Sequence, residues 1–260
     1  MTMKYIVVLL VMSLFVSCTK NSAVSDKNDG IYWSNEQLFT SGLNLFPFVP
    51  FTETEMKALS YDEKLKRRQI PPNFLHNMTS KDLFYQFVYC DLSKSMGLFN
   101  TMQQGFESVT EQLNMLPELL NRPDAGHVLL GILQKIEIGR IEELNGFWLF
   151  HCLQIILAQS VIINSMTDGN IDNYIQQQMR CHEIIRKLSA TNNNWKCPES
   201  VGIMLFGLGN VMIRYEFDPF MQLLETNQYC GGLMTSAMIK DEQTALIIID
   251  YIKNFKEQKK

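Results

Sequence analysis

Proline and glycine are scarce in this sequence, with 8 prolines and 14 glycines among 260 residues. An all-β chain needs many tight turns, and tight turns draw heavily on these two residue types. Helix-forming residues such as leucine, methionine, glutamine, glutamate and lysine are common along most of the length. The composition therefore excludes a turn-rich all-β fold and predicts an all-α chain.

An excess of charge of one sign is also lacking. The net charge is −4, and charged residues make up 19% of the chain. Proteins that bind nucleic acid usually gather basic side chains on one face, so this balance argues against nucleic acid as the main partner. Hydrophobic residues make up 46% of the sequence, which is typical of a globular protein rather than a disordered one.

Motifs that specify a reaction are missing from the sequence. It contains neither the G-x-S-x-G elbow of serine hydrolases nor the H-E-x-x-H pair of zinc proteases. Gly202, Gly207 and Gly209 follow no strand-like run and precede no Lys-Ser or Lys-Thr pair, so they do not form a phosphate-binding loop. We interpret these glycines as sites of close helix packing and expect no bound cofactor.

The first residues have the pattern of a lipoprotein signal peptide. A lysine at position 4 precedes an apolar run over 5–16, which is too short to span a bilayer comfortably. The run ends at Leu14-Phe15-Val16-Ser17-Cys18. This ending resembles a lipobox, in which a small residue precedes the cysteine that receives diacylglycerol. We predict a signal peptide over residues 1–17 and a lipid anchor on Cys18, with a plain secretory signal as the alternative.

The residues after Cys18 predict a tether and a location. Residues 19–30 are small and polar, so 18–30 is expected to be a flexible link between the lipid and a helical domain at 31–260. Thr19 is not the aspartate that retains lipoproteins in the inner membrane of enteric bacteria. The tether also lacks the acidic run that resembles a surface-export signal in Bacteroides-type lipoproteins. We therefore expect the protein on the outer membrane, facing the periplasm.

The domain at 31–260 is expected to hold about nine helices in an irregular or solenoid-like array. The first is expected from Thr54 to Gln69, where acidic residues precede a basic end. Another begins at Thr79, with Asp82 three residues later as in a capping box. Residues 146–163 are apolar nearly all round, and we interpret them as a buried central helix rather than a membrane span.

Two further features flank the first expected helix. Residues 31–52 hold many aromatic side chains around Pro47 and Pro50, which predicts an ordered, non-helical lead-in that packs on the domain. Four basic residues end the helix and are interpreted as a solvated helix end. They are Lys64, Lys66, Arg67 and Arg68.

Four stretches between about residues 62 and 135 carry a resemblance to a known family. They are RQIPPNFL at 68–75, MTSKDL at 78–83, QQGF at 103–106 and LPELLNRPDAG at 116–126. These stretches resemble a large, uncharacterised family of Bacteroides-type exported lipoproteins. The resemblance covers under a third of the chain, and its motifs are helix caps and links. It implies a helical, exported protein and no particular chemistry.

Two adjacent pairs, His151-Cys152 and Cys181-His182, suggest zinc ligands at first sight. Neighbours on a helix point about 100° apart, so one helix does not readily direct both side chains at one metal. The run 168–172 starts like a calcium loop but lacks the glycine and glutamate that such a loop needs further on. We expect buried thiols and histidines, a helix cap at 168–172, and no metal site.

Five cysteines remain after Cys18, so at least one thiol stays unpaired if disulfides form. Cys197 and Cys230 lie in loop-like stretches and are the predicted pair, although bridging geometry cannot be derived from sequence. A catalytic cysteine with a distant histidine stays open as an alternative.

The sequence predicts a cellular location and a fold, but it specifies no reaction. We expect a lipid-anchored envelope protein that works by interaction, as a scaffold or binding partner of another envelope protein. Whether it is an enzyme stays open, with the balance against. The alternatives are an envelope hydrolase with dispersed catalytic residues and a helical protein that binds a small ligand in its core.

Overall fold

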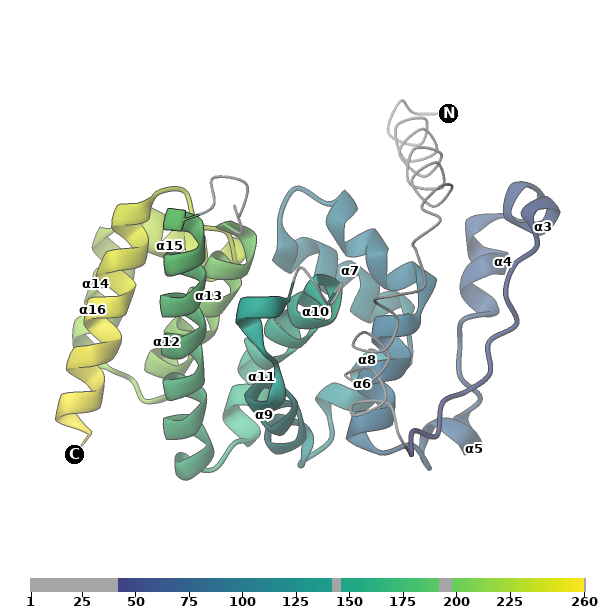
Figure 1. The fold of residues 1–260 in the computed structure, drawn as a ribbon, viewed down its shortest axis with the longest axis horizontal. Coiled ribbons are helices and arrows are strands. Elements are labelled where there is room, and N and C mark those ends of the chain that lie inside the picture. The colour runs from purple at the N-terminus through teal and green to yellow at the C-terminus, as the bar shows by residue number, and fades with distance from the viewer. Residues whose placement is uncertain (1–41, 142–145, 192–197, 260) are drawn as a thin grey trace. The chain divides into compact units, whose positions relative to one another are not determined.

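The computed structural model describes residues 42–141, 146–191 and 198–259, which form an all-α fold (Figure 1). This part of the chain contains α-helices and short 3-10 helices and no strand, so the predicted fold class is confirmed. The elements are α3 (Glu53–Ala58), α4 (Tyr61–Lys66), α5 (Pro72–Leu75), α6 (Ser80–Tyr89), η2 (Asp91–Leu98), α7 (Met102–Gln112), α8 (Met115–Leu120), α9 (Ala125–Lys135), η3 (Ile138–Arg140), α10 (Phe147–Leu157), α11 (Ser160–Ser165), α12 (Asp168–Thr191), α13 (Pro198–Arg214), α14 (Asp218–Thr226), α15 (Gln228–Ser236) and α16 (Glu242–Gln258).

The described residues hold more helices than the nine expected, because capping side chains interrupt several long runs. The predicted helix from Thr54 to Gln69 is wrong in this respect, since Leu59 and Ser60 are extended and separate α3 from α4. Ser60 begins α4 with a capping box: its hydroxyl accepts from Glu63 N at 3.3 Å, and the Glu63 carboxylate accepts from Ser60 N at 2.8 Å.

The predicted capping box at Thr79 is confirmed. The Thr79 hydroxyl accepts a hydrogen bond from Asp82 N at 3.1 Å, and the Asp82 carboxylate accepts one from Thr79 N at 2.9 Å. Two backbone donors at the start of α6 are therefore satisfied by side chains. The spacing alone identified this helix start correctly.

The apolar run at 146–163 is largely buried as expected, with Phe147 and Val161 exposed, but it forms two helices, α10 and α11. Gln159 is extended between them, and its amide nitrogen donates to Ile155 O at 2.8 Å. The same amide exchanges hydrogen bonds of 3.1 and 3.2 Å with Gln103 of α7, which supports the break. Among the helices that the structure describes, none is both long and apolar enough to cross a membrane.

Helix α13 packs against α10, α11, α12, α14, α15 and α16. Its glycines lie where neighbours come closest. A Cβ atom added to Gly202 would be 2.7 Å from the Ala237 carbonyl oxygen. One added to Gly207 would be 3.1 Å from the Ala158 Cβ and would collide with the Tyr174 hydroxyl. The interpretation of these glycines as close-packing sites is confirmed.

We predict that Gly207→Ala lowers the free energy of unfolding by about 1–3 kcal/mol, because the new methyl group overpacks a fixed contact. Gly131→Ala in α9 is the matched control, since a Cβ there meets no atom within 4 Å. Alanine is the better helix former, so the control should stabilise the fold by about 0.5–1 kcal/mol. Urea unfolding of both variants measures the difference, and equal shifts would contradict the packing argument.

Candidate functional site

Residues 43–51, called the strap from here on, lie along α6 in a non-helical conformation. Asn44 N donates to Asp82 Oδ1 at 2.9 Å, and Phe46 N donates to Gln86 Oε1 at 2.7 Å. Two residues of extended chain span about 6–7 Å, which matches the rise of about 6 Å between helix positions four apart. The helix therefore binds the strap through regularly spaced acceptors. The predicted non-helical lead-in is confirmed for 42–52, while 31–41 lies outside the described residues.

Aromatic contacts add to the attachment of the strap. The Phe46 ring packs edge-on against Phe48 and against Phe74 of α5, with centroid distances of 5.3 Å in both cases. The Phe46 and Phe48 side chains are half-buried, so part of the strap's apolar surface is removed from water. The strap thus bridges α5 and α6.

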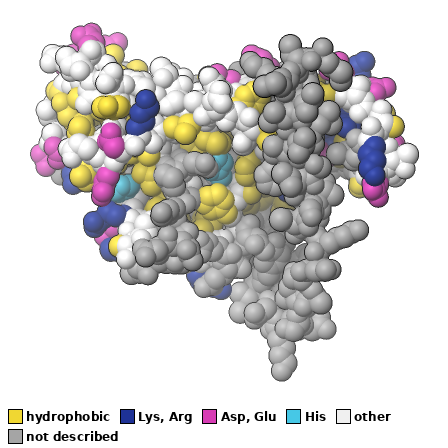
Figure 2. Space-filling view, turned by 90° about the horizontal axis from the view of Figure 1, so that it is seen from above, with side chains coloured by type: hydrophobic (Ala, Val, Ile, Leu, Met, Phe, Trp, Pro, Cys, Tyr) yellow, Lys and Arg dark blue, Asp and Glu magenta, His cyan; other side chains and the backbone are white. Residues whose placement is uncertain are grey.

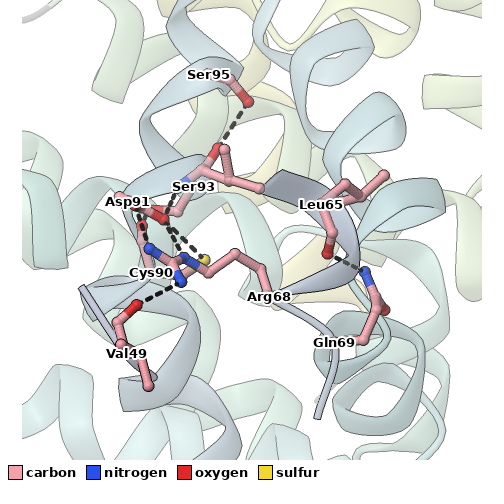
Figure 3. Close-up of polar contacts among 9 residues, drawn as sticks. Val49, Leu65, Arg68, Gln69, Cys90, Asp91, Ser93 and Ser95 are labelled. Atoms are coloured by element: carbon pink, nitrogen blue, oxygen red, sulfur yellow. Dashed lines mark hydrogen bonds and ion pairs between the residues drawn. The ribbon is translucent and has the colours of Figure 1, made fainter. Parts of the chain in front are cut away.

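Arg68 fixes the other end of the strap (Figure 3). Its guanidinium donates to both carboxylate oxygens of Asp91, at 2.7 and 2.8 Å, and to Val49 O at 3.2 Å. It also lies 3.9 Å from the Phe51 ring centre and 5.4 Å from that of Phe48. We call this group the Arg68 clasp. It combines a bidentate ion pair with cation–π contacts, which is the geometry that arginine favours.

The burial of Arg68 corrects a prediction from the sequence. Arg68 is 4% exposed and belongs to the core, whereas its neighbours Lys66 and Arg67 lie at the surface as expected. Burial alone raises the pKa of the Asp91 carboxyl. The hydrogen bonds and charge of Arg68 outweigh that effect and bring the pKa below its ordinary value. Both groups are therefore ionised at neutral pH, and the pair is a structural attachment.

Cys90 lies beside the clasp, with its Sγ 3.9 Å from Asp91 Oδ1. Burial raises the pKa of the Cys90 thiol to about 11. The reactive form of cysteine is the thiolate, which is scarce at neutral pH when the pKa is this high. The arrangement does not favour Cys90 as a nucleophile.

The two His-Cys pairs occupy buried helix positions. His151 and Cys152 are buried in α10, and burial lowers the pKa of His151 to about 4. In α12, Cys181 is buried, which raises the pKa of its thiol to about 12, and His182 is half-buried. Neutral thiols and a neutral imidazole do not make an activated nucleophile. Within the described ranges, His, Cys, Asp and Glu form no group of three able to hold a metal ion.

Helices α10 and α12 meet through a buried amide pair. Gln178 Nε2 donates to Gln154 Oε1 at 2.8 Å, and both side chains are fully buried. Tyr174 is buried one turn before Gln178, with its hydroxyl against Gly207. Among the described residues, the Tyr174 hydroxyl, Gln154 Nε2 and Gln178 Oε1 find no hydrogen-bond partner. Sliding α10 or α12 along the other would break the hydrogen bond between Gln154 and Gln178. This buried polar contact therefore fixes the register of the two helices.

The predicted lipidation and disulfide sites are only partly described. Cys18 and Cys197 lie outside the described residues, so the anchor and the pairing of Cys197 with Cys230 stay predictions. Cys230 itself is buried in α15, and the prediction of a loop there is wrong. The reason is a cap: Asn227 Oδ1 accepts from Tyr229 N and Cys230 N at 3.0 and 3.1 Å and starts a helix.

Comparison of the chain with protein-family models, with curated proteins and with solved structures finds no match. The resemblance over about residues 62–135 therefore stays an expectation. The described part of that range consists of helices and their caps, and its contribution to the site is Arg68, α6 and Asp91.

We predict that Arg68→Ala lowers the free energy of unfolding by about 2 kcal/mol, because it removes the ion pair and the aromatic contacts together. Arg67→Ala is the matched control. Arg67 pairs with Glu55 at the surface and lies 5.7 Å from the Phe51 ring centre; surface contacts of this kind add little, so this change should lower stability much less than Arg68→Ala. Denaturant unfolding and the rate of proteolysis within 43–51 measure both effects. A stable Arg68→Ala protein with a protected strap would contradict the role of the clasp.

We predict that His151 contributes to acid destabilisation. Its pKa is about 4 in the folded protein and 6.5 in the reference state, so the unfolded chain binds a proton more readily. The resulting stability is present above pH 6.5 and is lost as the pH falls toward 4, by about 2 kcal/mol between pH 7 and pH 5. His151→Phe should reduce this loss, measured by urea unfolding at both pH values. His127→Gln at an exposed position is the control, and an unchanged pH dependence in His151→Phe would contradict the prediction.

Proposed function

We propose that this chain is a lipoprotein of the bacterial envelope that works by interaction. In this proposal the signal peptide at 1–17 is removed, and Cys18 carries acyl chains, palmitate among them. The tether at 18–30 then holds the helical body on the periplasmic face of the outer membrane. The sequence pattern around Cys18 supports the anchor. The surface of the helical body supports the mode of action.

The observation that carries the interaction role is the apolar surface of the described helices. Large hydrophobic side chains remain well exposed at several elements. They include Tyr89, Phe99, Phe147, Val161, Met221, Tyr229 and Leu246. On the face seen in Figure 2, hydrophobic side chains are exposed both at the left end and in the middle, interspersed with charged ones. Exposed aromatic and methionine side chains of this kind are enriched in protein-binding surfaces.

The strap supports the part of the proposal that concerns the attachment of the helical body to its anchor. It follows the predicted tether along the chain and is attached to α6 and to the Arg68 clasp. A load applied to the N-terminus would therefore be passed to α6 through these contacts.

We predict that crosslinking in envelope preparations captures one near-stoichiometric protein partner with the wild-type chain and loses it with Cys18→Ala. The anchor concentrates the protein at the membrane, so removal of the acyl chains should abolish the encounter. Labelling with a palmitate analogue, followed by gel analysis, tests the anchor directly. Recovery of the protein alone in both forms would contradict the scaffold role and favour an envelope hydrolase.

Surface variants test the apolar face separately from the anchor. Phe99→Ser, Phe147→Ser and Tyr229→Ser each change an exposed side chain and should leave the fold intact. At least one of them should reduce capture of the partner at least fivefold while palmitate labelling stays unchanged. Full capture by all three would show that the partner binds elsewhere.

A further inference from the structure

Residues 52–67, called the arm from here on, connect the strap to the rest of the chain and consist mainly of α3 and α4. The structure leaves the arm at the surface. No residue of α4 is buried, and the described side chains of α3 are exposed or half-buried. In Figure 1, α3 and α4 lie at the edge of the described helices. A segment that buries so little apolar surface gains little stability from its present position.

The arm is divided by a hinge at Leu59 and Ser60. Leu59 has ψ 137°, and Ser60 has φ −63° and ψ 164°, so both residues are extended between two helices. The residues on either side, such as glutamate, lysine, alanine and leucine, favour helix, and their pattern predicts a single helix here. The capping box of Ser60 and Glu63 is what favours the break.

Most contacts of the strap come from outside the arm; from within the arm, the Arg67 guanidinium lies 5.7 Å from the Phe51 ring centre. Asp82 and Gln86 bind backbone N–H groups, Arg68 binds a backbone carbonyl, and Phe74 packs on an aromatic ring. A second copy of the chain offers an identical strap. The same acceptors and the same clasp can therefore hold a strap that arrives from another molecule.

We propose that two copies of this chain exchange their straps. The hinge straightens, α3 and α4 join into one helix of about 20 Å, and each strap binds α6 and the Arg68 clasp of the other copy. The hydrogen bonds and ring contacts that hold the strap within one molecule form again between two, so the balance depends on the hinge, on the Arg67–Glu55 ion pair that straightening breaks, and on the entropy of association. The exchange needs no lipid anchor, so its failure would leave the proposed envelope function untouched.

Crosslinking between differently marked copies tests the exchange. One full-length chain carries Asn44→Cys in the strap and the other carries Lys81→Cys beside Asp82, both with Cys18→Ser and Cys197→Ser. The remaining cysteines are buried. The two chains are unfolded together and refolded as a mixture, so slow exchange does not limit the result. A short bismaleimide should then produce a crosslinked heterodimer. Pairing Asn44→Cys with Glu257→Cys, at an exposed position on α16, is the control.

Two substitutions at the hinge shift the balance in opposite directions. Ser60→Ala removes the cap, so the equilibrium between the bent and the straight hinge should shift toward the continuous helix by about fivefold per hinge. Two hinges straighten in a dimer, so the dimerisation constant should rise about 25-fold. Ser60→Pro keeps the hinge bent, because proline disfavours a helix interior. The φ of −63° at Ser60 is the value that proline adopts, and the ψ of 137° at Leu59 is one that a residue before proline favours. This variant should abolish the heterodimer.

The crosslinking results distinguish strap exchange from random collision. A heterodimer that increases with Ser60→Ala and disappears with Ser60→Pro supports strap exchange, provided that circular dichroism shows both variants folded. A refolded mixture that gives no crosslinked heterodimer between the Asn44→Cys and Lys81→Cys chains would overturn it. An equal heterodimer yield in the wild type, in both hinge variants and in the Glu257→Cys control would also overturn it, because that pattern indicates random collision.

Discussion

The packing of six helices against α13 is the constraint on which the rest of the described fold depends. Close approach is possible because Gly202 and Gly207 leave no side chain where Ala237 and Tyr174 arrive. The fully buried amide pair between α10 and α12 lies beside this contact and fixes the register of those two helices. Burial of apolar surface supplies the driving force for folding. The glycines and the buried amides determine which arrangement of the short helices forms.

Local signals in the sequence predicted the parts of the fold that depend on local physics. The all-α class followed from composition, and the start of α6 followed from the spacing of Thr79 and Asp82. The same rule would have found the break at Ser60, where Glu63 stands three residues later, but helical periodicity on both sides concealed it. The break at Gln159 was not predictable in this way, because it is supported by Gln103, 56 residues away.

The candidate site was harder to predict for the same reason. Arg68 looks like the last of four basic residues at a helix end, and nothing near it indicates that Asp91 accepts two of its hydrogen bonds. Asp82 was identified as a cap, but its second oxygen binds Asn44, 38 residues earlier. Contacts between distant segments become visible when the chain is folded, and a single sequence carries no periodicity or spacing that specifies them.

The strap and the arm illustrate how a stable attachment and a movable one can coexist. The strap holds its place through two backbone donors, aromatic packing and the Arg68 clasp, whereas α4 buries no residue of its own. The arm is bent at the capping box of Ser60 and Glu63, and the Arg67–Glu55 ion pair across the hinge also holds the bend. If the strap leaves α6, the arm keeps its capping box, the Arg67–Glu55 ion pair and the contact of Tyr61 with Gln112, which helix propensity must then outweigh for the hinge to straighten. Exchange between copies is favourable under that condition, since it restores the strap's hydrogen bonds and ring packing without requiring the bend.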